Sequence, residues 1–219
     1  EAYGVTVENT KFEHVKAVEK KDEVVRVLTQ GIAGRLSRNK VKVVNGEASV
    51  DKDVDGILVS AGGETFAADH LIIATGSAPT VPPIEGVAEG LCTGEVLTSN
   101  ELLSIKEVPD RLVIVGGGVI GFEMAAYFRE AGSEVTVIEM LDKVLGSNDK
   151  EVSRLLQKDM EKKGVVFHLS SSVTEIKDGR VCFTKNGVEE TVPYDKVLMC
   201  VGRKANSQIE GLESLGIQT

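Results

Sequence analysis

The sequence predicts an α/β fold in which a parallel sheet with crossover helices carries a three-stranded meander. Three observations lead to this prediction. A short apolar run, residues 112–115, ends in a glycine turn and is followed by a helical stretch. A second strand, residues 134–138, comes next and ends at Glu139. Two segments, 69–76 and 195–202, repeat the order acid, apolar strand, glycine, which indicates a duplicated architecture.

The glycine turn fits the pattern G-x-G-x-x-G and reads Gly116-Gly117-Gly118-Val119-Ile120-Gly121. We expect Gly116 to permit a sharp turn, Gly118 to let a pyrophosphate approach, and Gly121 to let helix and strand pack closely. The helix that follows, residues 119–131, offers unpaired N–H groups and a positive dipole end to phosphates. Glu139 lies 18 residues after Gly121 (139 − 121), near the spacing at which an acid binds the adenosine ribose. The pattern favours nucleotide binding over a purely structural turn.

The composition is typical of a globular enzyme domain. The chain has 219 residues, of which 42% are hydrophobic, enough for one large core or two small ones. Its formal net charge is −9 without a basic block, which argues against a nucleic-acid partner. No apolar run approaches the ~20 residues that a membrane helix needs, and the first residues do not resemble a secretion signal. We therefore expect no membrane association and a cytoplasmic location.

The three cysteines, Cys92, Cys182 and Cys200, form neither a close pair nor a metal-binding spacing. This distribution predicts no structural disulfide and no metal site. We expect all three to pack as small buried hydrophobic residues.

The first part of the chain reads as a long helix followed by strands. Over the first 40 residues, apolar side chains recur at helical spacing, which predicts a helix packed on a sheet and closed by Asn39; they are Val24, Val25, Leu28, Ile32 and Leu36. A meander of strands at 40–44, 57–60 and 64–68 follows, and then an apolar strand at 71–74. A proline-bearing stretch and a short helix around Glu101 lead to the glycine-turn strand.

The second part of the chain also alternates between predicted helices and predicted strands. Asn148 with Glu151 predicts a capping box at the start of a second crossover helix, which Gly164 ends. Its apolar face is expected to comprise Val152, Leu155, Leu156 and Met160. Strands at 165–169 and 172–176 come next, and Asp178-Gly179 and Asn186-Gly187 predict the two turns of another meander. A last strand, 196–201, ends at Gly202.

The duplication predicts how the domains are arranged. If the halves correspond, a first glycine motif precedes Gly76 by 86 residues (202 − 116), near position −10 (76 − 86). We therefore expect an internal fragment of a longer protein. Its parts are an incomplete first domain at 1–83, a connection at 84–108, a nucleotide domain at 109–202 and a return to the first domain at 203–219.

Five ordered motifs, at residues 44–46, 74–77, 116–123, 137–140 and 200–206, resemble the flavoprotein disulfide reductases, the pyridine nucleotide-disulfide oxidoreductases of class I. Among these, the dihydrolipoamide dehydrogenases are the most similar. The resemblance implies a Rossmann-like NAD-binding domain inserted into part of a similar FAD-binding domain. It also implies electron transfer from a dithiol through a redox-active disulfide and FAD to NAD.

The resemblance further implies a homodimeric parent protein that acts on a lipoyl-type dithiol or on the lipoyl domain of a 2-oxoacid dehydrogenase complex. The redox cysteines and the His-Glu base of the family are absent from the sequence. We therefore expect the fragment itself to be inactive.

The family's contacts can be carried over to matching positions of this chain. NAD contacts are expected at Gly116 to Gly121, Glu123, Glu139, Val173 and Gly202, and FAD contacts at Ala48, Thr75, Gly76, Ser77 and Arg203. For Val173 and Ala48, ordinary sheet packing is an equal alternative. Glu123 is expected to be partly buried near the helix start and to pair with a lysine beside the flavin; the alternative is an acid stabilised by the helix dipole.

Alternative functions remain open at the level of sequence. Mercuric reductases, NADH oxidases and transhydrogenases share every motif present. A flavin-free NAD dehydrogenase is disfavoured, because no His, Tyr-x3-Lys or Ser-Tyr arrangement follows the glycine motif. A non-catalytic NAD-binding module is the third possibility.

Overall fold

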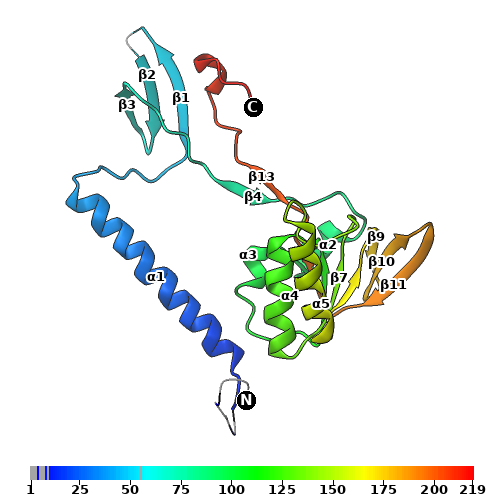
Figure 1. Cartoon of the computed structure of the whole chain (residues 1–219). Helices are drawn as coiled ribbons and strands as arrows, with labels where there is room; N and C mark the ends of the chain where they lie inside the picture. The colour runs from blue at the N-terminus through cyan, green and yellow to red at the C-terminus, as the bar shows by residue number, and fades with distance from the viewer. Residues whose placement is uncertain (1–3, 5–7, 9, 55) are drawn as a thin grey trace. The chain divides into compact units, whose positions relative to one another are not determined.

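The computed structural model describes residues 4, 8, 10–54 and 56–219, which form two compact units. Unit 1 comprises the described residues up to Asp22 together with Pro79–Arg203, and unit 2 comprises Glu23–Ala78 and Lys204–Thr219. The chain passes between the units in α1 (His14–Arg38) and in the paired strands β4 (Ser77–Pro79) and β13 (Arg203–Ala205) (Figure 1).

The centre of unit 1 is a five-stranded parallel sheet with the order β5-β12-β6-β7-β8. Its strands are β5 (Val96–Leu97), β12 (Lys196–Met199), β6 (Arg111–Val115), β7 (Glu134–Ile138) and β8 (Val166–His168). The chain adds β7 and β8 on one side of β6 and later places β12 on the other side. The strand order therefore reverses between β6 and β12, at the position where open α/β sheets bind ligands.

Alternate residues of β6 supply two different cores, because neighbouring side chains of a strand point to opposite faces. Leu112 and Ile114 pack in a cluster with Phe128 of α4 (Val119–Ala131) and Met160 of α5 (Lys150–Lys162). These two helices cover one face of the sheet (Figure 1).

Val113 and Val115 of β6 pack in the other cluster with Phe183 of the meander and Val87 of α2 (Val87–Thr93). The meander contains β9 (Ser171–Lys177), β10 (Arg180–Lys185) and β11 (Val188–Pro193). β6 is therefore buried on both faces, as its continuous apolar sequence predicted.

The two meander turns are those that the sequence predicted. Asp178 and Gly179 have φ angles of 50° and 70°, and Asn186 and Gly187 have φ angles of 51° and 78°. Two successive positive φ values are the requirement of type I′ hairpins, which Asp-Gly and Asn-Gly meet at low steric cost.

The segment 84–108 contains more regular structure than its weak periodicity indicated. Besides α3 (Ser99–Leu102), it forms α2 and β5, and β5 pairs with β12 in the sheet of unit 1. Thr98 caps α3, since its side chain accepts from Asn100 N–H and Glu101 bonds back to the Thr98 backbone.

The predicted start of α5 was wrong by one residue. Asp149, not Asn148, is the N-cap, and its Oδ1 accepts hydrogen bonds from Glu151 N–H at 2.8 Å and Val152 N–H at 3.2 Å. The apolar face was also only partly correct. Met160 is buried, whereas Val152, Leu155 and Leu156 are exposed.

Unit 2 contains the antiparallel meander β1 (Ala48–Asp53), β2 (Gly56–Ala61) and β3 (Glu64–Ala68), and ends with the 3-10 turn η1 (Leu212–Leu215). The strand predicted at 40–44 was wrong, because that segment has no strand assignment and its neighbour Ala48–Asp53 pairs with β2 instead. An ideal Cβ on Gly46 would lie 2.8 Å from Gly62 N, so the chain crosses the β2–β3 turn there.

The apolar strand predicted at 71–74 was also wrong. Within the described residues this segment has no strand partner, and Ile72 is 89% exposed. The apolar residues of α1 were expected to pack on a sheet, but Val25, Leu28 and Ile32 are exposed in the described part of the chain. Both segments are apolar enough for a buried element, yet these side chains are exposed.

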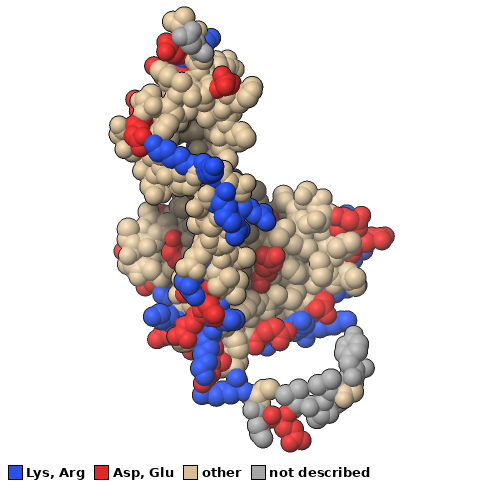
Figure 2. All heavy atoms as spheres, turned by 90° about the vertical axis from the view of Figure 1, so that its left-hand side faces the viewer, with Lys and Arg blue, Asp and Glu red and all other residues tan. Residues whose placement is uncertain are grey.

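Three further observations concern the helices and the surface. No helix among the described residues has the length and apolar character needed to cross a membrane. On the face shown in Figure 2, acidic side chains lie among the basic ones. Cys92 is exposed, whereas Cys182 and Cys200 are partly buried, so the expectation that all three cysteines are buried was wrong for Cys92 and only partly met for the other two.

Candidate nucleotide site

The candidate site lies at the carboxyl end of the parallel sheet, where β6 turns into α4. Gly116 has a φ of 110°, a left-handed value that favours glycine. Gly121, in the first turn of α4, faces the strand so closely that an ideal Cβ would lie 2.1 Å from the carbonyl oxygen of Gly116. The turn is thus as tight as the sequence predicted, and a side chain at Gly121 has no room.

Gly118 has a different environment from its neighbours. It is the N-cap of α4, has an extended backbone (φ −69°, ψ −173°) and contributes no side-chain cap. An ideal Cβ on Gly118 would meet no atom within 4 Å, so the space in front of the helix start is open. This open cradle fits a pyrophosphate, which needs close access to the N–H groups of a helix start.

Glu139 lies beside this cradle, at the end of β7. Its Oε2 accepts the N–H of Gly117 at 2.5 Å, and its Oε1 accepts the N–H of Leu141 at 2.8 Å. The half-buried carboxylate is therefore held by two backbone donors, with its remaining lone pairs available for ribose hydroxyls.

A cavity of about 270 Å³ opens next to Gly116 and Glu139. Val173 of β9 lines it, as do residues from the ends of β6, β7 and β12 and from the segment before α2. The lining residues that the sequence analysis missed are Pro82, Ile84, Val115, Ile138, Met140, Ser171, Ser172 and Val201. Their signal was positional. Several of them lie at the carboxyl end of a parallel strand or within two residues of it, and such residues meet at one edge of the sheet.

Cys200 lies beneath the glycine turn. Its Sγ donates to the carbonyl oxygens of Val115 at 3.4 Å and Gly116 at 3.2 Å. Burial raises the pKa of the Cys200 thiol to about 12, and the negative charge of Glu139 adds to this effect. A thiol of this kind is a packing residue rather than a nucleophile.

The remaining NAD residues of the sequence analysis occupy the following positions. Gly202 follows β12 with a φ of 144°, and its carbonyl oxygen accepts the N–H of Thr80 at 2.9 Å. Val119 and Ile120 begin α4. Glu123 also lies on α4, but its side chain is exposed, so the burial expected from its apolar neighbours is not observed.

The residues expected to contact FAD lie in or next to unit 2. Thr75 Oγ1 donates to Asn206 O at 2.5 Å, and Asn206 N–H donates to Gly76 O at 3.0 Å. Ser77 begins β4, Arg203 begins β13, and Ala48 begins β1 as an exposed residue. In the described part of unit 2, no helix follows a strand through a glycine turn like that of Gly116.

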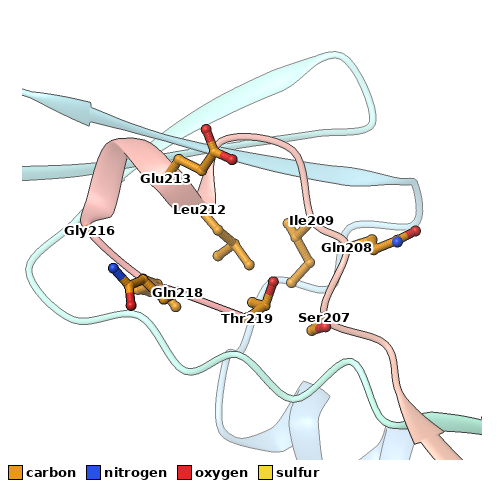
Figure 3. Close-up of a pocket in the computed structure, with 9 residues that line it drawn as sticks. Ser207, Gln208, Ile209, Leu212, Glu213, Gly216, Gln218 and Thr219 are labelled. Carbon is orange, nitrogen blue, oxygen red and sulfur yellow. The ribbon is translucent and has the colours of Figure 1, made fainter.

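Besides the cavity of unit 1, a pocket lies in unit 2 and is formed by its last residues (Figure 3). Leu212 and Ile209 contribute apolar side chains to it, and Gln218 and Glu213 contribute polar ones. None of the residues expected to contact a nucleotide lines this pocket, and we assign it no ligand.

Known proteins resemble nearly the whole of this chain. The family model for pyridine nucleotide-disulphide oxidoreductases matches residues 2–219. A dihydrolipoyl dehydrogenase from Acholeplasma laidlawii is 42% identical over 207 residues, which are 94% of this chain and 60% of the relative. A dihydrolipoyl dehydrogenase from Bacillus subtilis is 38% identical over 221 residues, which are 98% of this chain and 46% of the relative.

Among solved structures, the HOCl-induced flavoprotein disulfide reductase RclA from Escherichia coli is similar, with a TM-score of 0.80 and 27% sequence identity. The match covers 95% of this chain and 47% of RclA. The chain thus spans about half the length of the relatives that it matches. From the match to the family model over nearly all of its residues, this chain belongs to the pyridine nucleotide-disulphide oxidoreductase family.

Proposed function

We propose that unit 1 binds NAD(H) as the nucleotide-binding part of an FAD-dependent disulfide oxidoreductase of the dihydrolipoyl dehydrogenase type. One observation carries the proposal: the open cradle at Gly118 adjoins the carboxylate of Glu139 where the strand order reverses. An open helix start, with an acid at the end of the neighbouring strand, is the arrangement that dinucleotides require.

The proposed contacts follow the path of a dinucleotide across the sheet edge. Residues 116–121 receive the pyrophosphate, and Glu139 binds the adenosine ribose. Val173, in the cavity wall, packs against the adenine, and Gly202 lies near the nicotinamide. Glu123, exposed on α4, is proposed as an ion-pair partner near the flavin.

The relatives support a reaction for the whole protein. A dihydrolipoyl dithiol is oxidised to the lipoyl disulfide, two electrons and one proton reduce NAD⁺ to NADH, and a second proton is released. FAD, when bound, supplies the electron carrier between dithiol and nucleotide. We propose that residues 1–83 and 203–219 belong to the FAD-binding domain, with Ala48, Thr75, Gly76, Ser77 and Arg203 as its contacts.

We also propose that residues 109–202 form the NAD domain and that residues 84–108 connect it to the first domain. The proposed partners are NAD(H) and a lipoyl-type dithiol, free or on the lipoyl domain of a 2-oxoacid dehydrogenase complex. The proposed assembly is a homodimer in the cytoplasm.

Cofactor choice provides the test. Glu139 would repel a 2′-phosphate, and Lys143 is engaged elsewhere, since its Nζ donates to Asn148 O at 2.7 Å. We expect NADH to bind at least about tenfold more tightly than NADPH, a difference of about 1.4 kcal/mol, in titration calorimetry. Glu139→Arg should reverse the preference, because it replaces the repelling carboxylate by a phosphate-binding guanidinium.

The matched control is Glu134→Gln, which removes an exposed acid at the other end of the same strand. This variant should bind both nucleotides as the unaltered protein does. Equal affinity of the unaltered protein for NADH and NADPH, or no affinity for either, would refute the proposal.

A further inference from the structure

The loop between β7 and α5 contacts the glycine turn through a backbone hydrogen bond. The N–H of Leu145 donates to the carbonyl oxygen of Gly117 at 2.8 Å. The N–H of the same glycine donates to Glu139 Oε2 at 2.5 Å. Gly117 is therefore held at both of its backbone polar groups.

Leu145 has an unusual backbone conformation for its residue type. Its φ is 61°, in the left-handed region that residues with a large side chain rarely adopt. Its side chain is only 8% exposed, and the side chain of the preceding Val144 is fully buried. Such strain persists only where the surrounding structure fixes it, and it is frequent where ligands are held.

The rest of the loop fixes this conformation. The carbonyl oxygen of Leu145 accepts the backbone N–H of Asn148 at 2.9 Å and its side-chain Nδ2 at 3.0 Å. The carbonyl oxygen of Asn148 in turn accepts Lys143 Nζ at 2.7 Å. The loop thus presents the Leu145 N–H to Gly117 in one defined orientation.

This contact determines the direction of the next N–H group. A trans peptide is planar, so the carbonyl oxygen of Gly117 and the N–H of Gly118 point in opposite directions. Because Leu145 binds the Gly117 carbonyl, the Gly118 N–H is directed away from the loop. It lies at the start of α4, at the residue whose ideal Cβ would meet no atom within 4 Å.

We propose that Leu145 is a positioning residue for nucleotide binding, which locks the Gly117–Gly118 peptide so that the Gly118 N–H faces the pyrophosphate. The role belongs to the main-chain N–H of Leu145 and to its left-handed backbone, not to contact between its side chain and the ligand. The inference rests on the proposed function, because the clamp orients a donor toward the nucleotide proposed there.

The decisive experiment removes this single N–H. Replacing Leu145 by its α-hydroxy acid analogue through nonsense suppression converts the amide into an ester and retains the side chain. Losing one positioning hydrogen bond should weaken the affinity for NADH and for ADP-ribose by about three- to tenfold. The affinity for adenosine, which has ribose hydroxyls but no pyrophosphate, should stay within about twofold by NMR titration.

Two substitutions complete the set. Leu145→Gly keeps the N–H and suits the left-handed backbone but loses a buried side chain, so it should weaken NADH binding less than the ester does. Asn148→Ala removes one of the two donors to the Leu145 carbonyl, and should weaken NADH binding less than the ester does while sparing adenosine. Asn148→Ala also tests the inference if the ester variant does not fold.

The possible outcomes separate the inference from the proposed function. If the unaltered protein binds no NADH, the proposed function fails and the inference fails with it. If the unaltered protein binds NADH and the ester variant binds it equally well, only the inference fails. A loss of NADH and adenosine affinity in equal proportion would also overturn it, because that result would show a general structural role.

Discussion

Gly118 and Gly121 belong to one turn but are glycines for different physical reasons. A Cβ at Gly121 would collide with the Gly116 carbonyl and lie 2.9 Å from Cys200 Sγ, whereas a Cβ at Gly118 would enter open space. Glycine at position 121 is therefore required by the fold. Glycine at position 118 is required only if a ligand occupies the space in front of it.

This difference predicts opposite behaviour for two valine variants. Gly118→Val should abolish NADH binding and change the free energy of unfolding by less than about 1 kcal/mol, since the N-cap has no side-chain bond to lose. Gly121→Val should destabilise the fold by more than about 3 kcal/mol or prevent folding, because backbone must move to admit it. Urea unfolding and NADH titration measure both quantities. Normal NADH binding by Gly118→Val would show that the turn is purely structural.

The cysteines permit a second test at the scale of single residues. Burial holds the pKa of Cys200 near 12, above an ordinary value of about 9, so the thiol stays protonated in the folded protein. Cys92, in contrast, is exposed on α2. At pH 8, iodoacetamide should label Cys92 and leave Cys200 unmodified until urea unfolds the protein.

The same shift has a consequence for stability. Between about pH 9 and pH 12, the Cys200 thiol ionises in the unfolded protein but stays protonated in the folded protein. The free energy of unfolding therefore falls as the pH rises through this range. Cys200→Ala should therefore reduce the alkaline fall in unfolding free energy. Mass spectrometry of the folded Cys92→Ser variant should find no label on Cys200. Rapid labelling of Cys200 in the folded protein would contradict the burial described above.

The residues of the candidate site that follow a recognisable sequence pattern could be proposed from the sequence. The glycine turn and Glu139 could be found because their spacing along the chain reflects a single β-α-β unit. Met140, Ser171 and Val201 were missed, because they reach the cavity from separate strands and share no sequence pattern. The exposure of Glu123 was also unpredictable from its apolar neighbours, since adjacent helix positions face different directions.

At the scale of elements, a single capping residue stabilises the start of α5. Asp149 accepts two backbone N–H groups at the helix start, where its negative charge also complements the helix dipole. Asp149→Ala should lower the free energy of unfolding by about 1 kcal/mol in urea titrations. Lys150→Ala, at the next residue, is the matched control and should have a smaller effect, because Lys150 is exposed and does not cap the helix. An unchanged stability of Asp149→Ala would contradict the cap assignment.

Elements with a strong local pattern were predicted well, and those that depend on distant partners were not. The central strands and both type I′ turns agree with the sequence, since buried apolar runs and Asn-Gly or Asp-Gly pairs carry their own signal. β1 was missed because its sequence ASVDKD has few strand-favouring residues, and its pairing with β2 decides its conformation. The segment 71–74 was predicted as a strand because it is apolar. The prediction failed because composition alone does not supply the hydrogen-bonded neighbour that a strand needs.

At the scale of the whole molecule, the proposed nucleotide site lies within one unit. The cavity beside Glu139 is lined entirely by residues between Pro82 and Val201, which lie in unit 1. The strands β4 and β13, at the two boundaries of this segment, pair with each other. The ends of the segment are therefore adjacent, as they are in domains that tolerate excision.

This organisation predicts that a chain restricted to residues 79–203 retains NADH binding within about threefold of the intact chain. Several contacts are lost, among them the hydrogen bonds of His14 Nδ1 with the hydroxyl of Tyr127 at 2.9 Å and of His14 Nε2 with Ile105 O at 3.0 Å, so stability should decrease. Calorimetry on the shortened chain is the measurement, and the same chain with Glu139→Arg is the control. A folded segment without NADH affinity would show that unit 2 contributes to the site.

The position of β12 also bears on how the protein is made. This strand lies between β5 and β6 in the sheet, yet it is the last of the sheet's strands to be synthesised. Asp195, just before β12, pairs with Arg111, 84 residues earlier, at 2.5 Å. During translation the emerging chain must keep two unpaired strand edges until residues 196–199 leave the ribosome. The nascent protein is therefore most prone to aggregation just before the strand that completes its sheet appears.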